Sequence, residues 1–219
     1  MKRRLLPLIA VLLWGASVSM LQRWDESRGM TEYLSVPPAR TAKAIGAGYD
    51  NIVADSLYVQ FIYYFGRHMR RDRDFHNMAP VLDLVTDLDP QFHDAYFMGA
   101  MALSDNEQMA EAERLLEKGV RMNPEEWRYA YSAGMAMFLF GDSEPQYLKA
   151  AEFFKQAAAL PGSPPEARFM QARMYEATGR NQLLIAAWTD TYRNAPSAEA
   201  RAIAERSLRK LGVDPTRAN

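Results

Sequence analysis

The chain of 219 residues is long enough for one ordinary domain or for a short array of repeats. Hydrophobic residues make up 48% and charged residues 24%, a composition that is typical of folded proteins and excludes a wholly disordered chain. The formal net charge of -1 gives no indication of nucleic-acid binding, and the absence of cysteine excludes disulfides, thiolate metal sites and a cysteine nucleophile.

The amino terminus has the layout of an export or anchoring signal. Basic residues at positions 2–4 precede an apolar or weakly polar run from Leu5 to Leu21, and polarity returns at Gln22. A run of this length lies at the short end of what spans a bilayer. We interpret residues 1–24 as an uncleaved signal anchor, with a cleaved signal peptide and a buried helix of a cytoplasmic protein as the alternatives. In the first two cases the basic residues stay inside and the body is exported.

The next stretch, residues 25–48, contains Pro37-Pro38 and the pair Gly46 and Gly48, so we expect a tether. It runs into a segment from Gly48 to Gly66 with aromatic side chains nearly all round the predicted helix. These are Tyr58, Phe61, Tyr63, Tyr64 and Phe65. A helix that is apolar on all sides is expected to be buried on more than one face.

A repeated pattern follows. Pro90, Pro124 and Pro196 each come after an amphipathic run that ends in a short polar stretch, and the first two are 34 residues apart. Counting back from each proline defines three units, residues 59–92, 93–126 and 165–198, and a further unit, residues 127–162, starts near Trp127 between them.

Each unit has small residues where helices are expected to approach closely and a bulky residue that fills the space between them. The small residues at position 8 of the four units are Gly66, Ala100, Gly134 and Ala172. The residues at position 24 are Leu82, Leu116, Phe154 and Trp188. Proline near the end of a unit stops the second helix, because it cannot continue the hydrogen-bond ladder.

This pattern resembles the tetratricopeptide repeat (TPR) family over residues 59–198. The resemblance implies an all-α solenoid of about four helix–turn–helix repeats, preceded by the N-terminal hydrophobic helix. The segment Gly48–Gly66 resembles the entry helix of membrane-anchored bacterial members. The sequence departs from the family in an insertion around Ser143-Glu144-Pro145 and in the missing tryptophan at position 4, where it has Ile62, Tyr96, Ala130 and Arg168.

Residues 197–211 form a further amphipathic segment, with Ser197 as a candidate N-cap and Gly212 as a candidate stop. We expect it to be a capping helix, since the last repeat of an array needs a cover with a polar outer face. The TPR domain then extends over residues 49–212, and residues 213–219 are a short tail.

The resemblance implies that the first helix of each repeat lines a concave wall. The residues that point into it would be Tyr63, Phe97, Tyr131 and Phe169 at position 5, Arg67, Met101, Met135 and Arg173 at position 9, and Arg128 at position 2. An aromatic strip with adaptable methionines and flanking arginines suits an extended or helical peptide that carries carboxylates. In the alternative interpretation, the aromatic rings pack against the neighbouring helix. A chaperone-tail clamp is rejected, because the family's clamp has Lys and Asn where this chain has Tyr63 and Arg67.

Other candidate sites are weaker. The basic residues Arg67, His68, Arg70, Arg71 and Arg73 could meet anionic lipid or an acidic partner, although aspartates between them favour a solvated turn. The three histidines, His68, His76 and His93, are interpreted as surface or capping residues. No metalloprotease, phosphate-loop, nucleophile-elbow or zinc-ligand spacing occurs, so we expect no catalytic, metal or cofactor site.

The sequence therefore predicts a single-pass protein of a bacterial inner membrane with its TPR domain in the periplasm, or a periplasmic protein if the leader is cleaved. We expect a non-enzymatic scaffold or adaptor that binds a protein or peptide partner during assembly of an envelope complex of secretion, pilus or respiratory type. The alternatives are a permanent accessory subunit of a larger membrane complex and, third, an enzyme with an unrecognised site.

Overall fold

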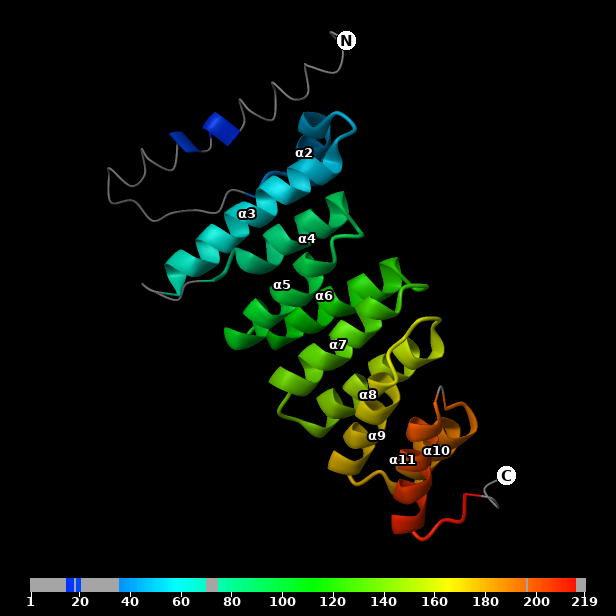
Figure 1. The fold of residues 1–219 in the computed structure, drawn as a ribbon. Coiled ribbons are helices and arrows are strands. Elements are labelled where there is room, and N and C mark those ends of the chain that lie inside the picture. The colour runs from blue at the N-terminus through cyan, green and yellow to red at the C-terminus, as the bar shows by residue number, and fades with distance from the viewer. Residues whose placement is uncertain (1–14, 18, 21–35, 70–74, 196, 216–219) are drawn as a thin grey trace. The chain divides into compact units, whose positions relative to one another are not determined.

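The computed structural model describes residues 15–17, 19–20, 36–69, 75–195 and 197–215. Within them the chain is all-α, and its helices pack in sequential antiparallel pairs (Figure 1). The prediction of an all-α protein is confirmed. The chain divides at Leu115 into two compact units, each with its own packing.

The first unit contains α2 (Ala39–Gly46), α3 (Asp50–His68), α4 (Met78–Leu88), α5 (His93–Asp105) and the beginning of α6 (Met109–Met122). Its core lies where α3 meets α4. The large side chains there are fully buried, among them Leu57, Phe61, Met78, Leu82 and Val85. Helix α2 falls within the stretch expected to be a tether, and it packs against α3 and α4.

The second unit contains the rest of α6 and α7 (Trp127–Phe140), α8 (Glu144–Ala159), α9 (Glu166–Ala177), α10 (Asn181–Arg193) and α11 (Ala198–Lys210). Each helix packs against the next, from α7 to α11. Met137, Phe154 and Met174 are almost completely buried between the first pairs, and Leu208 is buried under α11. Short connections, residues 141–143 and 178–180, keep paired helices antiparallel.

Two glycines allow helices to approach closely. A Cβ atom at Gly134 of α7 would lie 2.9 Å from ring atoms of Phe154 in α8. A Cβ atom at Gly99 of α5 would lie 2.7 Å from Leu82 in α4. The expected pairing of a small residue with a bulky one is thus observed between Gly134 of α7 and Phe154 of α8. On α5, the expected small residue was Ala100, but the close approach to α4 is at Gly99, one residue earlier.

The expectation for Gly66 was wrong. Nothing lies within 4 Å of a Cβ atom built at Gly66. The reason is the long connection between α3 and α4, residues 69–77, compared with residues 106–108 between α5 and α6. Counting back from Pro90 assumes a short connection between α3 and α4. Because the connection is longer, the count assigns motif positions to the wrong residues of α3.

Helix α3 also differs from expectation in its burial. One face is buried against protein, but Val59, Ile62 and Tyr63 on another face are 53%, 47% and 71% exposed. The prediction that α3 is buried on more than one face therefore does not hold among the described residues.

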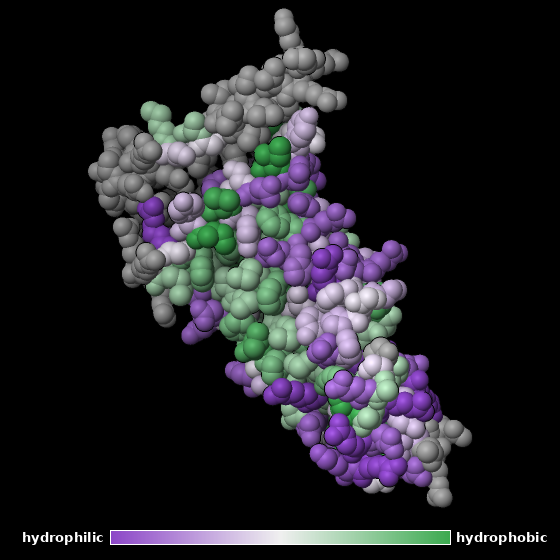
Figure 2. All heavy atoms as spheres, in the orientation of Figure 1, coloured by the Kyte–Doolittle hydropathy of each residue, from purple (hydrophilic) through white to green (hydrophobic). Residues whose placement is uncertain are grey.

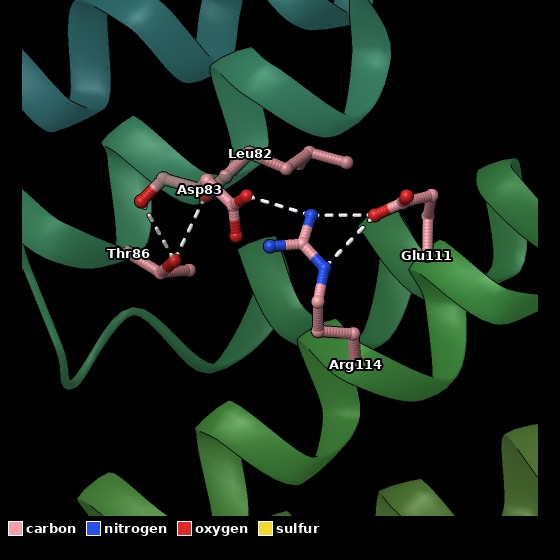
Figure 3. A network of polar contacts seen from close by, with 5 residues as sticks. All are labelled: Leu82, Asp83, Thr86, Glu111 and Arg114. Atoms are coloured by element: carbon pink, nitrogen blue, oxygen red, sulfur yellow. Dashed lines mark hydrogen bonds and ion pairs between the residues drawn. The ribbon is translucent and has the colours of Figure 1, made fainter.

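Ion pairs between exposed or partly exposed side chains connect α4 with α6 and α6 with α8. In the first unit, Arg114 of α6 lies 2.8 Å from the carboxylate of Asp83 in α4 and also donates hydrogen bonds to Glu111 (Figure 3). Thr86 of α4 is buried, and its hydroxyl donates to the carbonyls of Leu82 and Asp83 (Figure 3). In the second unit, Lys149 of α8 forms an ion pair with Glu117 of α6.

The residues around Ser143-Glu144-Pro145, interpreted from the sequence as an insertion, lie at the amino end of α8. Ser143 and Gln146 form a capping box with Pro145 in the first turn, so these residues start the helix instead of forming a loop. This first turn reaches the next pair, since Arg180 lies 2.5 Å from Glu144.

The prediction of a helix at residues 197–211 is confirmed, since α11 occupies this segment. The Ser197 side chain accepts a hydrogen bond from the Ala200 amide at the start of α11. Gly212 follows the helix with a positive φ of 75°, which suits a glycine stop. Within the described residues, no helix is both long and apolar enough to cross a membrane. The predicted anchor, residues 1–24, lies almost entirely outside them.

Candidate binding surface

In the second unit, one face of α7 carries Tyr131, Met135 and Phe138, spaced as neighbours on a helix. The guanidinium of Arg173 from α9 lies over the Phe138 ring, 5.1 Å from its centroid. This cation–π contact brings α9 onto the face of α7 that holds Met135. Three of the predicted groove residues, Tyr131, Met135 and Arg173, therefore belong to adjacent first helices of the second unit.

Phe138 was missed by the sequence analysis. The signal for it was available, because Phe138 follows Met135 by three residues and Tyr131 by seven.

The aromatic rings at position 5 also serve packing. Tyr131 meets Phe154 edge-on at 5.6 Å and Trp127 at 5.9 Å, and it packs against a small core of alanines. Phe169 lies 5.8 Å from Trp188 of its own helix pair. Both rings are half-buried, so each is only partly accessible to a ligand.

Two predicted groove arginines differ in their surroundings. Arg128 is exposed, and its guanidinium is held 3.1 Å from Glu126 at the start of α7. Arg173 is also exposed and contacts the Phe138 ring. A carboxylate ligand would compete with Glu126 for Arg128. At Arg173 it would meet a guanidinium that lies over the Phe138 ring.

In the first unit, the predicted residues lie on α3 and α5. Tyr63 is the most exposed aromatic residue there, and Arg67 is half-buried one turn later. Phe97 stacks on His93 at 6.3 Å, and Met101 is half-buried one turn further along α5.

Electrostatics on these helices are set mainly by burial. Burial raises the pKa of Tyr131, and the carboxylate of Glu166 at the start of α9 raises it further. Burial beside Phe92 and the nearby charge of Asp94 raise the pKa of Tyr58 to about 12. Both phenols are therefore neutral hydrogen-bonding groups at physiological pH.

Two shallow depressions lie in the second unit. One, of about 550 Å³, is lined by side chains of α6 and α8 that include Arg121, Lys149 and Phe153. Burial lowers the pKa of Lys149 even though Glu117 pairs with it. The other, of about 460 Å³, lies among α8, α9 and α10 and contains the ion pair of Arg168 and Asp190.

The histidines lie at separate places in the first unit. His68 is buried, with its ring 4.3 Å from Tyr64. The expectation of a surface position was wrong for this residue, because the aromatic side chains of α3 and Phe75 enclose it. His76 lies 3.0 Å from the side chain of Asn77. Across the described parts of the chain, no group of three or more histidine, aspartate or glutamate side chains is placed to hold a metal ion.

Comparisons with known proteins give no relationship for this chain. No family model, no curated protein and no solved structure matches it.

Proposed function

We propose that this chain is a membrane-tethered scaffold of tetratricopeptide type that binds a protein or peptide partner during assembly of a bacterial envelope complex. The segment of residues 1–24 would hold it in the inner membrane, with the helical body in the periplasm. Its action would be stoichiometric binding without catalysis.

The repeat assignment is supported by where helices begin and end. The units of residues 93–126, 127–162 and 165–198 each contain one antiparallel helix pair, namely α5–α6, α7–α8 and α9–α10. The small residues of the motif are fully buried in these pairs. They include Ala100, Ala112, Ala150, Ala157 and Ala172.

The observation that carries the binding role is the contact of Arg173 with Phe138. It places an exposed cation on an aromatic ring beside the half-buried Met135 and Tyr131. Arginine held on an aromatic face keeps its planar edge open for a carboxylate, and methionine adapts to different apolar side chains. This arrangement fits an acidic, partly apolar peptide segment.

The test is a crosslinked pull-down of the full-length protein from membranes of its native host, quantified by mass spectrometry. Arg173→Glu replaces attraction with repulsion and is expected to weaken capture of the partner roughly tenfold or more. Arg201→Glu is the matched control, because Arg201 lies over the Tyr192 ring at 4.6 Å on the capping helix. Equal capture by both variants and the parent protein would contradict a role for the α7–α9 surface.

The alternative of a permanent accessory subunit is favoured by one observation, the exposed apolar face of α3. A partner that co-purifies in fixed ratio with the parent chain and with Arg173→Glu alike would support this alternative.

A further inference from the structure

The exposed large apolar side chains of the first unit concentrate on one face of α3. The stripe consists of Ile52, Val59, Ile62 and Tyr63, which are 37%, 53%, 47% and 71% exposed, together with Gly66, which has open space around it. At 3.6 residues per turn these positions fall within about 100° of arc on the helix. Figure 2 shows hydrophobic surface along α3 on the face turned to the viewer.

The stripe is separate from the packed face of α3. Val53, Leu57 and Phe61 point toward the protein core and are fully buried. Along the stripe, Asp55 is the one charged side chain, and it lies near the amino end of the helix. The centre of the stripe, from Val59 to Gly66, is uncharged.

The exposed face of α11 in the second unit differs in character from the α3 stripe. At the carboxyl end, α11 covers α10 with an outer face that carries exposed charged residues, and Figure 2 shows hydrophilic surface there. These residues include Glu199, Arg201, Arg206, Arg209 and Lys210. Terminal repeats in water require such a polar cover. Helix α2 packs against α3 and α4, yet among the described residues the α3 stripe stays exposed, and an apolar surrounding would favour it.

We infer that the α3 stripe rests on the surface of the lipid bilayer, with Val59, Ile62 and Tyr63 inserted at the level of the head groups and upper acyl chains. This inference rests on the proposed membrane tether. A helix with one apolar face in the interface and the other packed on protein accounts for aromatic and aliphatic residues on both faces of α3.

Chain length and side-chain chemistry support a lipid surface as the occupant. Residues 22–38 connect the apolar run to α2 and span at most roughly 56 Å when fully extended, whereas α3 is about 28 Å long. The tether therefore keeps the stripe within reach of the membrane. Tyr63 has an apolar ring and a polar tip, as residues at membrane interfaces commonly do. Exposed Arg40 and Lys43 on α2 add attraction to anionic lipid.

The chain has no cysteine, so single labelling sites can be introduced without background. Val59→Cys and Ile62→Cys in the full-length protein would each carry an environment-sensitive fluorophore, after reconstitution into vesicles of phosphatidylcholine and phosphatidylglycerol. Leu139→Cys on α7 is the matched control, because Leu139 is 53% exposed like Val59. Quenching is measured with doxyl-labelled lipid and with aqueous iodide.

The expected result is loss of fluorescence to the lipid quencher at positions 59 and 62, with protection from iodide, while the probe at position 139 shows the reverse. Iodide quenching at 59 and 62 as strong as at 139 would overturn the inference, since the stripe would then face water. Lipid quenching at all three positions would also overturn it, because the protein would be adsorbing without a preferred face.

Protection of positions 59 and 62 from both quenchers would show that protein covers the stripe and would likewise overturn the inference. Protection that fades as protein is diluted among vesicles would identify a second copy, and protection independent of dilution would identify the chain's own apolar run. An alkaline wash of the same vesicles distinguishes failure of the proposed membrane tether from failure of the proposed docking of α3. Release of the protein means that the tether itself fails, whereas retention with water-exposed probes means that only the docking of α3 fails.

Discussion

Among single residues, Gly134 shows how close contact between paired helices depends on the absence of a side chain. Phe154 is fully buried, so its ring cannot move aside for a Cβ atom at 2.9 Å. Gly66, also in a helix, has nothing within 4 Å. The same substitution is therefore expected to act in opposite directions at the two sites.

Gly134→Ala is expected to lower the free energy of unfolding by about 1–3 kcal/mol, because the new methyl group overpacks a filled core. Gly66→Ala is expected to raise it by about 0.5–1 kcal/mol, since alanine restricts the unfolded chain and favours helix. Denaturant titration followed by circular dichroism measures both values. A loss of stability from Gly66→Ala as large as that from Gly134→Ala would contradict the packing described for α3.

At the scale of elements, Arg168 shows how one side chain connects neighbouring helices. Its guanidinium donates to the carbonyl of Ala158 at the end of α8, 3.3 Å away, and pairs with Asp190 of α10. Asn194 also donates to the Asp190 carboxylate at 2.7 Å. One side chain on α9 thus joins the two helices that flank it. The arginine side chain is only 20% exposed, so solvent screens this pair less than a fully exposed one.

A double-mutant cycle with Arg168→Gln and Asp190→Asn is expected to give a coupling energy of roughly 1 kcal/mol, measured by denaturant unfolding. The pair of Arg209 and Glu205 on α11 is the control, with 68% and 38% exposed side chains. Its coupling energy is expected to be at most roughly 0.5 kcal/mol, as for exposed pairs within one helix. Equal coupling in the two pairs would mean that the ion pair of Arg168 and Asp190 adds no more between α9 and α10 than an exposed pair within one helix.

For the whole molecule, much of the helix layout follows from the sequence. Pro124 closely follows the end of α6 at Met122, and Ser197 begins α11, because proline and side-chain caps act locally on the backbone. The register of α3 was wrong, since it depends on the length of a connection that carries no periodic signal. The burial of His68 was missed as well, because it depends on Phe75 of the connection packing beside the end of α3, which spacing within a helix does not predict.

The candidate binding surface was predicted less completely. The family resemblance named Tyr131, Met135 and Arg173 as groove residues, at positions 5 and 9 of the third and fourth units. It gave no indication that Arg173 would lie on Phe138, since that contact joins α7 and α9. The partner of Arg128 is also a local one, Glu126, and the family pattern does not encode it.

The packing between the described helices is local along the chain. Helix α4 packs against α2, α3 and α5, and α11 packs on α10. Stability in such an arrangement is close to a sum of helix-pair terms and interfaces between neighbours, so a local defect is expected to stay local.

Leu208→Ala removes a fully buried side chain of α11 and is expected to cost about 2–5 kcal/mol at that site. Hydrogen exchange followed by mass spectrometry should then show faster exchange in α10 and α11, with α4 and α5 protected as in the parent protein. Leu82→Ala, which removes a fully buried side chain of α4, is expected to give the converse pattern. Uniform loss of protection in both variants would show that the chain unfolds as one cooperative body, and the local account of its stability would be wrong.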